Sequence, residues 1–282
     1  MFEAIGTRWT VTTDVPLDDG ARALVTAELA RIDTRWSRFR PDSRVAEMSR
    51  RAGCYPIDPA DRPLLDWYRR LYDATGGSVT PLVGVTLADA GYDAQYSLVP
   101  RETVRPVPDW DAVLIDHGDH LQLREPVLLD VGAAGKGFAV DRVADIVDGY
   151  CDEWIVDAGG DMVFSARAQP VRVALEHPLD PAKAIGLTAL RGGSVCASAG
   201  NRRAWAGWHH IVDPHTTAPA REVLASWAVA PSALIADGLA TALFFVPADT
   251  LRARLNQPFG HLVVRGTGAV DHAAFETLEL FT

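Results

Sequence analysis

Two polar side chains stand four residues apart in an otherwise apolar segment near the C-terminal end of the chain. Asp237 and Thr241 lie among alanines and leucines in segment 233–245, which has the composition of a buried helix. Residues four apart face the same side of a helix, about 6 Å apart along its axis. A carboxylate with a hydroxyl offers hard oxygen ligands, which suit Mg²⁺ shared with a substrate phosphate. The alternative is a carboxylate that is hydrogen-bonded within the core.

A glycine-rich loop, residues 130–137 (DVGAAGKG), separates a predicted buried strand from a predicted helix. Its glycines permit close backbone approach, and the helix N-terminus offers free amides, an arrangement that suits phosphate. Standard nucleotide motifs do not fit, because Asp130 replaces the first Walker A glycine and Val140 the third glycine of a dinucleotide fingerprint. Lys136 strengthens the phosphate interpretation, since only two of the 27 basic residues are lysine. Tight strand-to-helix packing is the alternative.

Histidine could supply a base near neutral pH. His209 and His210 begin the sequence HHIVDP, an extended run that ends in an Asp-Pro turn. Adjacent strand residues point to opposite faces, so the pair does not predict a two-histidine metal site. Either histidine alone is more often a partly buried structural residue than a base. His117 and His120 have no cysteine or third histidine nearby and are predicted to lie at the surface.

Composition excludes several classes of protein. The chain has 282 residues, of which 48% are hydrophobic, as in an ordinary soluble globular protein. With 37 acidic and 27 basic residues its net charge is −10, which argues against a nucleic-acid partner. Three cysteines cannot all pair within the chain, so reduced thiols and a cytoplasmic location are expected. The sequence shows no signal peptide and no apolar run long enough for membrane insertion.

Hydrophobic periodicity predicts the elements that must position these groups. Helices are predicted over about 18–36, from 58 to the Gly76-Gly77 pair, over 137–147 and over 233–245. Strands are predicted at 10–15, 113–115, 121–123, 127–129, 154–156, 171–175, 187–190, 194–197, 227–230 and 261–264, with a last β segment within 269–280. This order predicts a mixed α/β or α+β protein, one domain over residues 1–282 with a mixed or antiparallel sheet and several long helices.

Taken in order, these segments resemble the ApbE family of FAD:protein FMN transferases. The resemblance covers most of the chain and rests on Gly6-Thr7, 37–43 (SRFRPDS), 76–81 (GGSVTP), 130–141 (DVGAAGKGFAVD), 157–161 (DAGGD), 194–198 (SVCAS), 210–214 (HIVDP) and 237–241 (DGLAT). Several motifs in register are more specific than any one. The chain differs from common family residues at Ile5, Phe39, Val79, Thr80 and 197–200, which leaves the expected metal and pyrophosphate positions unchanged.

The resemblance implies a chemistry. A family member binds FAD, holds Mg²⁺ at its pyrophosphate and transfers FMN to a Thr or Ser hydroxyl of an acceptor flavoprotein, with release of AMP. The implied metal ligands are Asp237, Thr241 and the backbone carbonyl of Ala133, and the implied general base is His210. Cofactor contacts are expected at Asp130, Lys136, Gly135, Ser78, Thr80, Phe39 and Ile211. The alternatives are an FAD pyrophosphatase, in which water replaces the hydroxyl, and a non-catalytic FAD carrier.

Overall fold

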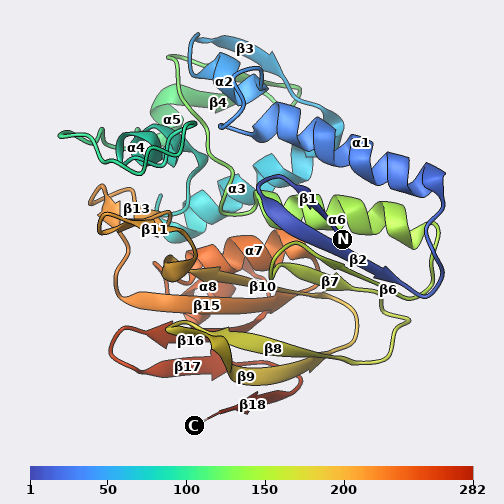
Figure 1. Cartoon of the computed structure of the whole chain (residues 1–282). Helices are drawn as coiled ribbons and strands as arrows, with labels where there is room; N and C mark the ends of the chain where they lie inside the picture. The colour runs from blue at the N-terminus through green and yellow to red at the C-terminus, as the bar shows by residue number, and fades with distance from the viewer. Residues whose placement is uncertain (282) are drawn as a thin grey trace.

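The computed structural model describes residues 1–281 and arranges them in three layers (Figure 1). The middle layer is an eight-stranded sheet, in which every strand pairing is antiparallel within the described residues. Its strands run in the order β1 (Phe2–Ala4), β2 (Thr7–Thr13), β6 (Trp154–Asp157), β7 (Met162–Phe164), β10 (Ser194–Ala199), β15 (Val223–Ala230), β16 (Gly260–Arg265) and β17 (Val270–Ala273).

Smaller antiparallel sheets complete the β structure. One has the order β18 (Leu278–Leu280), β9 (Asp180–Leu190) and β8 (Val171–His177), and another the order β3 (Gly53–Pro56), β5 (His120–Leu123) and β4 (Leu114–Asp116). Two short hairpins pair β11 (Ala204–Trp205) with β12 (Trp208–His209) and β13 (Val212–Asp213) with β14 (Ala218–Pro219). The β8, β9 and β18 sheet forms the third layer, in the lower part of Figure 1, and shares a hydrophobic cluster with β10, β15 and β16.

In the part of the chain that the structure describes, eight helices lie on the other side of the large sheet, with α6 and α7 packed directly on it and α1 and α3 packed on those two (Figure 1). They are α1 (Asp19–Trp36), α2 (Arg44–Met48), α3 (Arg62–Thr75), α4 (Gly84–Asp89), α5 (Trp110–Val113), α6 (Gly135–Asp148), α7 (Ala233–Ala242) and α8 (Ala248–Leu255). Short 3₁₀ turns span Pro59–Asp61, Pro81–Val83 and Gly200–Arg203. Within residues 1–281, each helix is too short or too polar to span a lipid bilayer. The α+β fold predicted from the sequence is confirmed.

Strand alternation builds a hydrophobic core on each face of the large sheet. In β10, Val195 belongs to the cluster under β8 and β9, whereas Cys196 belongs to the cluster under the helices. On β15, Trp227 likewise belongs to the cluster under β8 and β9, and Ala228 to the cluster under the helices. Because successive side chains of a strand point to opposite faces, one strand serves both cores. The same alternation turns Ser198, at the end of β10, toward α7, where its hydroxyl lies 3.2 Å from Thr241 Oγ1.

Helices α6 and α7 cross at very close range. A Cβ atom on Gly137 would lie 2.1 Å from the carbonyl oxygen of Ala233, so only glycine fits there. Asp141 of α6 accepts hydrogen bonds from the first amides of α7, those of Ala233 and Leu234, each at 2.8 Å. Ser232 caps the same helix through the amide of Ile235. The sequence therefore fixes the N-terminal turn of α7 against α6.

Asp141→Ala is expected to lower the free energy of unfolding by about 2 kcal/mol or more, because it leaves two amides at the start of α7 without their acceptors. Urea unfolding followed by circular dichroism measures this change. Asp145→Ala on the same helix is the matched control, since the Asp145 side chain is exposed and pairs only with Arg142. Equal stability of the two variants would show that Asp141 does not hold the helices together.

Most predicted elements are confirmed, with shifted ends. Helix α1 begins and ends within one residue of the prediction, and β2 begins three residues earlier than predicted. Part of the 58–75 helix is the 3₁₀ turn before α3, α6 begins at Gly135, and α7 ends at Ala242 rather than 245. The segment predicted within 269–280 divides into β17 and β18, which belong to different sheets.

The strand predicted at 127–129 is wrong. This segment is mostly buried and is not part of a strand, and the backbone hydrogen bonds at its two ends go to helix α2 and to the 3₁₀ turn at Pro81–Val83. Val127 N donates to Met48 O at 3.2 Å, and the next residue after the segment, Asp130, donates to Pro81 O at 2.7 Å. An apolar run of three residues indicates burial but does not distinguish a strand from a buried connection. The connection nevertheless leads directly into the glycine loop.

Candidate active site

A cavity of about 820 Å³ opens where the helix layer meets the ends of β6 and β10. Its walls include the C-terminal end of α1, the turn after α3, the glycine loop 130–137 and one face of α7. All eleven positions that the sequence singles out for catalysis, cofactor binding or metal binding line this cavity. Segments more than 200 residues apart in the sequence therefore meet in one cavity. The volume of this cavity is typical of small-molecule binding sites.

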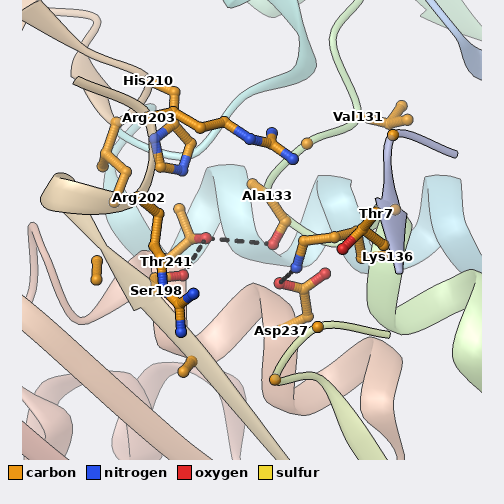
Figure 2. Close-up of a pocket in the computed structure, with 18 of the residues that line it drawn as sticks. Thr7, Val131, Ala133, Lys136, Ser198, Arg202, Arg203, His210, Asp237 and Thr241 are labelled. Carbon is orange, nitrogen blue, oxygen red and sulfur yellow. Dashed lines mark hydrogen bonds and ion pairs between the residues drawn. The ribbon is translucent and has the colours of Figure 1, made fainter. Parts of the chain in front are cut away.

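Oxygen atoms from the glycine loop and α7 converge at the base of the cavity. Thr241 Oγ1 lies 3.3 Å from the carbonyl oxygen of Ala133 (Figure 2). Asp237, one turn earlier on α7, faces the same space and is 1% exposed. Gly137 N donates to Asp237 Oδ2 at 2.8 Å and fixes the carboxylate, while Ala133 N donates to the hydroxyl of Tyr68 at 3.1 Å and fixes the loop.

This arrangement fits a hard divalent cation. Adjacent oxygen ligands of an octahedral ion at about 2.1 Å lie about 3 Å apart, close to the separation of the Thr241 and Ala133 oxygens. Residues 1–281 contain no cluster of three or more His, Cys, Asp or Glu side chains placed for a metal. An ion at Asp237 would therefore depend on the hydroxyl, the carbonyl and substrate phosphates, as Mg²⁺ commonly does. Burial raises the pKa of Asp237 to about 7, and the Asp161 carboxylate adds to the increase.

Lys136 lies between two carboxylates at the edge of this oxygen cluster. Its ammonium pairs with Asp161 Oδ2. It also lies 3.8 Å from Asp237 Oδ1 (Figure 2). Burial disfavours the ammonium, but the two carboxylates outweigh that effect and hold the Lys136 pKa above its usual value. The lysine is therefore charged, and a quarter of its side chain stays exposed toward the cavity. A point charge here suits a phosphate.

His210 faces the same cavity from the segment before β13, above Thr241 in the view of Figure 2. Its Nδ1 atom is buried and has no hydrogen-bond partner. Burial lowers the pKa of His210 to about 3, with Arg203 and His209 adding to the decrease. The imidazole is therefore neutral over the physiological range and carries an unused nitrogen. A neutral nitrogen can accept a proton from a bound hydroxyl or donate to a bound acceptor.

Asp130 is held by an arginine at the other side of the cavity. Arg38 Nε donates to Asp130 Oδ2, and its Nη1 donates to the carbonyl oxygen of Tyr92 at 2.5 Å. The guanidinium lies 4.2 Å from the ring centroid of Phe39 and 4.6 Å from that of Tyr92. Phe39 in turn stacks on Tyr96, with ring centroids 4.9 Å apart. These rings provide a flat apolar wall that suits an aromatic ligand.

The remaining predicted contacts take different positions in the cavity wall. Ser78 is half-buried, whereas the buried Thr80 hydroxyl accepts the amide of Leu82 at 3.2 Å and is already engaged in a turn. Ile211 is buried, and Gly135 N donates to Val131 O at 2.7 Å inside the glycine loop. Of these four positions, Ser78 has a partly exposed side chain without a hydrogen-bond partner in the described residues, whereas the Ile211 side chain is packed in the core.

Several cavity residues were not predicted as site residues. Arg38 and Ser198 lie within the family-like segments, so their positions carried a signal that the site prediction did not use. Asp161, in another of these segments, is buried just behind the cavity wall and pairs with Lys136. Tyr92 and Tyr96 carried none, because they belong to an irregular segment after α4 that only the tertiary fold brings to Phe39. His117 and His120, predicted to lie at the surface, stack on each other in the β4–β5 hairpin outside the cavity wall.

These features define the class of protein: an antiparallel α+β protein in which a glycine loop, a lysine and a helix with paired oxygen ligands share one pocket. The same fold occurs in solved structures. The ApbE protein of Thermotoga maritima superposes with a TM-score of 0.82 at 24% identity, over 96% of this chain and 95% of that chain. The flavin transferase ApbE from Vibrio cholerae superposes with a TM-score of 0.78 at 19% identity, over 98% of this chain and 96% of that chain.

The chain belongs to the ApbE family, whose sequence model matches residues 5–264. The FAD:protein FMN transferase of Treponema pallidum is 30% identical over 237 residues, which cover 73% of this chain and 65% of that protein. Its counterpart in Rhodobacter capsulatus is 28% identical over 67% of this chain and 39% of that protein. The FAD:protein FMN transferase of Salmonella typhimurium is 26% identical over 86% of this chain and 76% of that protein. The chain thus spans less than two thirds of the length of the Treponema and Rhodobacter relatives.

Proposed function

We propose that this chain is a Mg²⁺-dependent FAD:protein FMN transferase that attaches FMN to a Thr or Ser hydroxyl of an acceptor flavoprotein and releases AMP. One observation carries the proposal: Asp237, Thr241 and the Ala133 carbonyl converge beside Lys136 in a cavity of ligand size. The relatives from Treponema pallidum and Salmonella typhimurium are FAD:protein FMN transferases, which supports it. A cytoplasmic location agrees with the three free cysteines.

In the proposed reaction, the acceptor oxygen forms a bond to the FMN-side phosphorus as the bond from that phosphorus to the bridging oxygen breaks. AMP leaves with the bridging oxygen, and the hydroxyl proton passes to a base. A bound divalent cation would supply charge neutralisation at the pyrophosphate. Lys136 and the amides of the glycine loop would bind the phosphates, and the Phe39 wall would orient the flavin. Such positioning dominates phosphoryl-transfer catalysis.

His210 is the proposed base because its buried Nδ1 atom is free to accept the hydroxyl proton. Its low pKa in the structure arises mainly from burial, with the positive charge of Arg203 adding to it. Bound phosphates would offset that positive charge and raise the basicity of the ring when substrate is present. The neutral form needed for proton acceptance is thus available before substrate binds.

The ligand-free protein gives a direct pH test of this environment. Because the lowered pKa of His210 is about 3, its imidazole should stay neutral between pH 8 and pH 5. We therefore expect the His210 ring resonances in NMR spectra to show no titration in that range. His210→Gln identifies the signals by their loss. A titration with a midpoint near pH 6 would show that the ring is hydrated and that this description of the site is wrong.

Incubation with FAD, Mg²⁺ and a candidate acceptor protein separates the proposed transfer from the two alternatives. Fluorescent flavin that stays on the acceptor after denaturation, with one AMP per flavin, supports transfer. Free FMN and AMP in equal amounts support a pyrophosphatase, in which water takes the place of the hydroxyl. FAD that remains bound and intact supports a carrier and contradicts the proposal. Omission of Mg²⁺ is the matched control for each product.

A further inference from the structure

Asp161 makes the closest contact to Lys136, although the proposed reaction gives Asp161 no part. The carboxylate is 1% exposed, and its Oδ2 atom pairs with the Lys136 ammonium. Its other oxygen accepts the amide of Ala197 on β10 at 3.4 Å. A carboxylate this deeply buried is costly unless it is paired. The chain therefore places a charged group here whose principal partner is the lysine.

The turn between β6 and β7 fixes this carboxylate in place. Ala158 N donates to Asp161 O at 2.9 Å, and Gly160 N donates to Asp157 Oδ1 at 2.9 Å, which closes the turn. Gly159 has a φ of 69°, a conformation that favours glycine. The DAGGD sequence thus returns the chain sharply and sets Asp161 between the sheet and the first turn of α6.

The neighbouring carboxylate, that of Asp237, competes for the same ammonium. Lys136 Nζ lies 3.8 Å from Asp237 Oδ1, the oxygen not engaged by the Gly137 amide. A lysine side chain has four rotatable carbons and a compact charge, so a small rotation would close this gap. Once paired with Asp237, the ammonium would occupy the side of the carboxylate that faces Thr241 and Ala133. A divalent cation would then have to displace it.

We infer that Asp161 is a positioning residue that retains the Lys136 ammonium and so keeps Asp237 Oδ1 available to a divalent cation. This inference rests on the proposed metal site at Asp237. With the ammonium in contact with Asp161, Asp237 Oδ1 lies 3.8 Å from it and has no closer positive charge to displace before a cation enters. Asp161 pairs with the lysine without removing it from the cavity, so Lys136 stays available to phosphate while Asp237 stays available to metal.

Mn²⁺ binding tests the inference without turnover. The probe is Mn²⁺ alone, titrated into the intact chain while the free ion is measured by electron paramagnetic resonance. Asp161→Asn keeps the size of the side chain but loses the charge, so the lysine should move to Asp237 and raise the Mn²⁺ dissociation constant about 10- to 100-fold. Adding Lys136→Met to Asp161→Asn removes the competitor and should return the constant to within about threefold of the native value.

A matched control separates local competition from loss of charge. Asp157→Asn removes one negative charge from the same turn without touching Lys136, and should change the Mn²⁺ constant by less than about threefold. Equal weakening by Asp157→Asn and Asp161→Asn would overturn the inference, as would an Asp161→Asn/Lys136→Met variant that binds as weakly as Asp161→Asn. Native-like binding by Asp237→Asn, or no binding by the native chain, would instead refute the proposed metal site, and the inference with it.

Discussion

Asp237→Asn is expected to reduce AMP release from FAD by about a thousandfold or more at limiting Mg²⁺. The amide has nearly the shape of the carboxylate and can still accept the Gly137 hydrogen bond, so the contact between α6 and α7 should survive. What is lost is the one negative charge on α7 that faces Thr241 and Ala133. Initial rates measured by chromatography of AMP, with Mg²⁺ as the varied component, give the effect.

Two controls limit the interpretation of this result. Thr241→Ser retains the hydroxyl ligand and should keep most of the activity, whereas Asp249→Asn removes an exposed acid on α8 and should have no effect. Unfolding curves of Asp237→Asn should remain close to those of the native chain. Full activity of Asp237→Asn at limiting Mg²⁺ would exclude Asp237 as a metal ligand.

His210→Ala is expected to slow transfer to the acceptor by about 10²- to 10⁴-fold while FAD still binds. The side chain lies at the cavity wall with its Nδ1 atom unpaired, so its removal breaks no hydrogen bond within the described residues. FAD affinity is measured by quenching of flavin fluorescence without Mg²⁺, and transfer by flavin bound to the denatured acceptor. The two measurements separate binding from chemistry.

The neighbouring histidine provides the comparison. His209 bonds to the carbonyl oxygen of Ala220 at 2.7 Å and supports the local hairpins, so His209→Gln should affect stability more than transfer. If His210→Ala weakens FAD binding as much as it slows transfer, His210 is a binding residue and the base must be another group. If His210→Ala transfers flavin at the native rate, no base is needed at that position.

Sequence patterns predicted those site residues that lie close together along the chain. The spacing of Asp237 and Thr241 on an apolar helix correctly placed both on one face of α7, because helical periodicity is a property of consecutive residues. The glycine loop and Lys136 were likewise visible as a break between apolar segments. The carbonyl of Ala133 had no signal of its own, since any residue has a carbonyl, and only the family resemblance indicated it.

Contacts between distant segments could not be predicted in this way. The pairing of Lys136 with Asp161 joins α6 to the turn after β6, and no spacing rule connects those positions. The stack of Phe39 on Tyr96 depends on an irregular segment without periodicity. The run at 127–129 is buried without being a strand, and burial alone produces the same apolar pattern as a paired strand. In each case tertiary packing decides the outcome.

Anomalous diffraction from crystals soaked with Mn²⁺ and ADP would test the central claim most directly, because ADP carries the pyrophosphate without the flavin. We predict one strong manganese peak bounded by Asp237 Oδ1, Thr241 Oγ1 and the carbonyl oxygen of Ala133, with phosphate oxygens completing its coordination and Lys136 still paired with Asp161. A peak elsewhere in the cavity, or ADP bound there with no manganese beside Asp237, would contradict the proposed metal site and the reaction built on it.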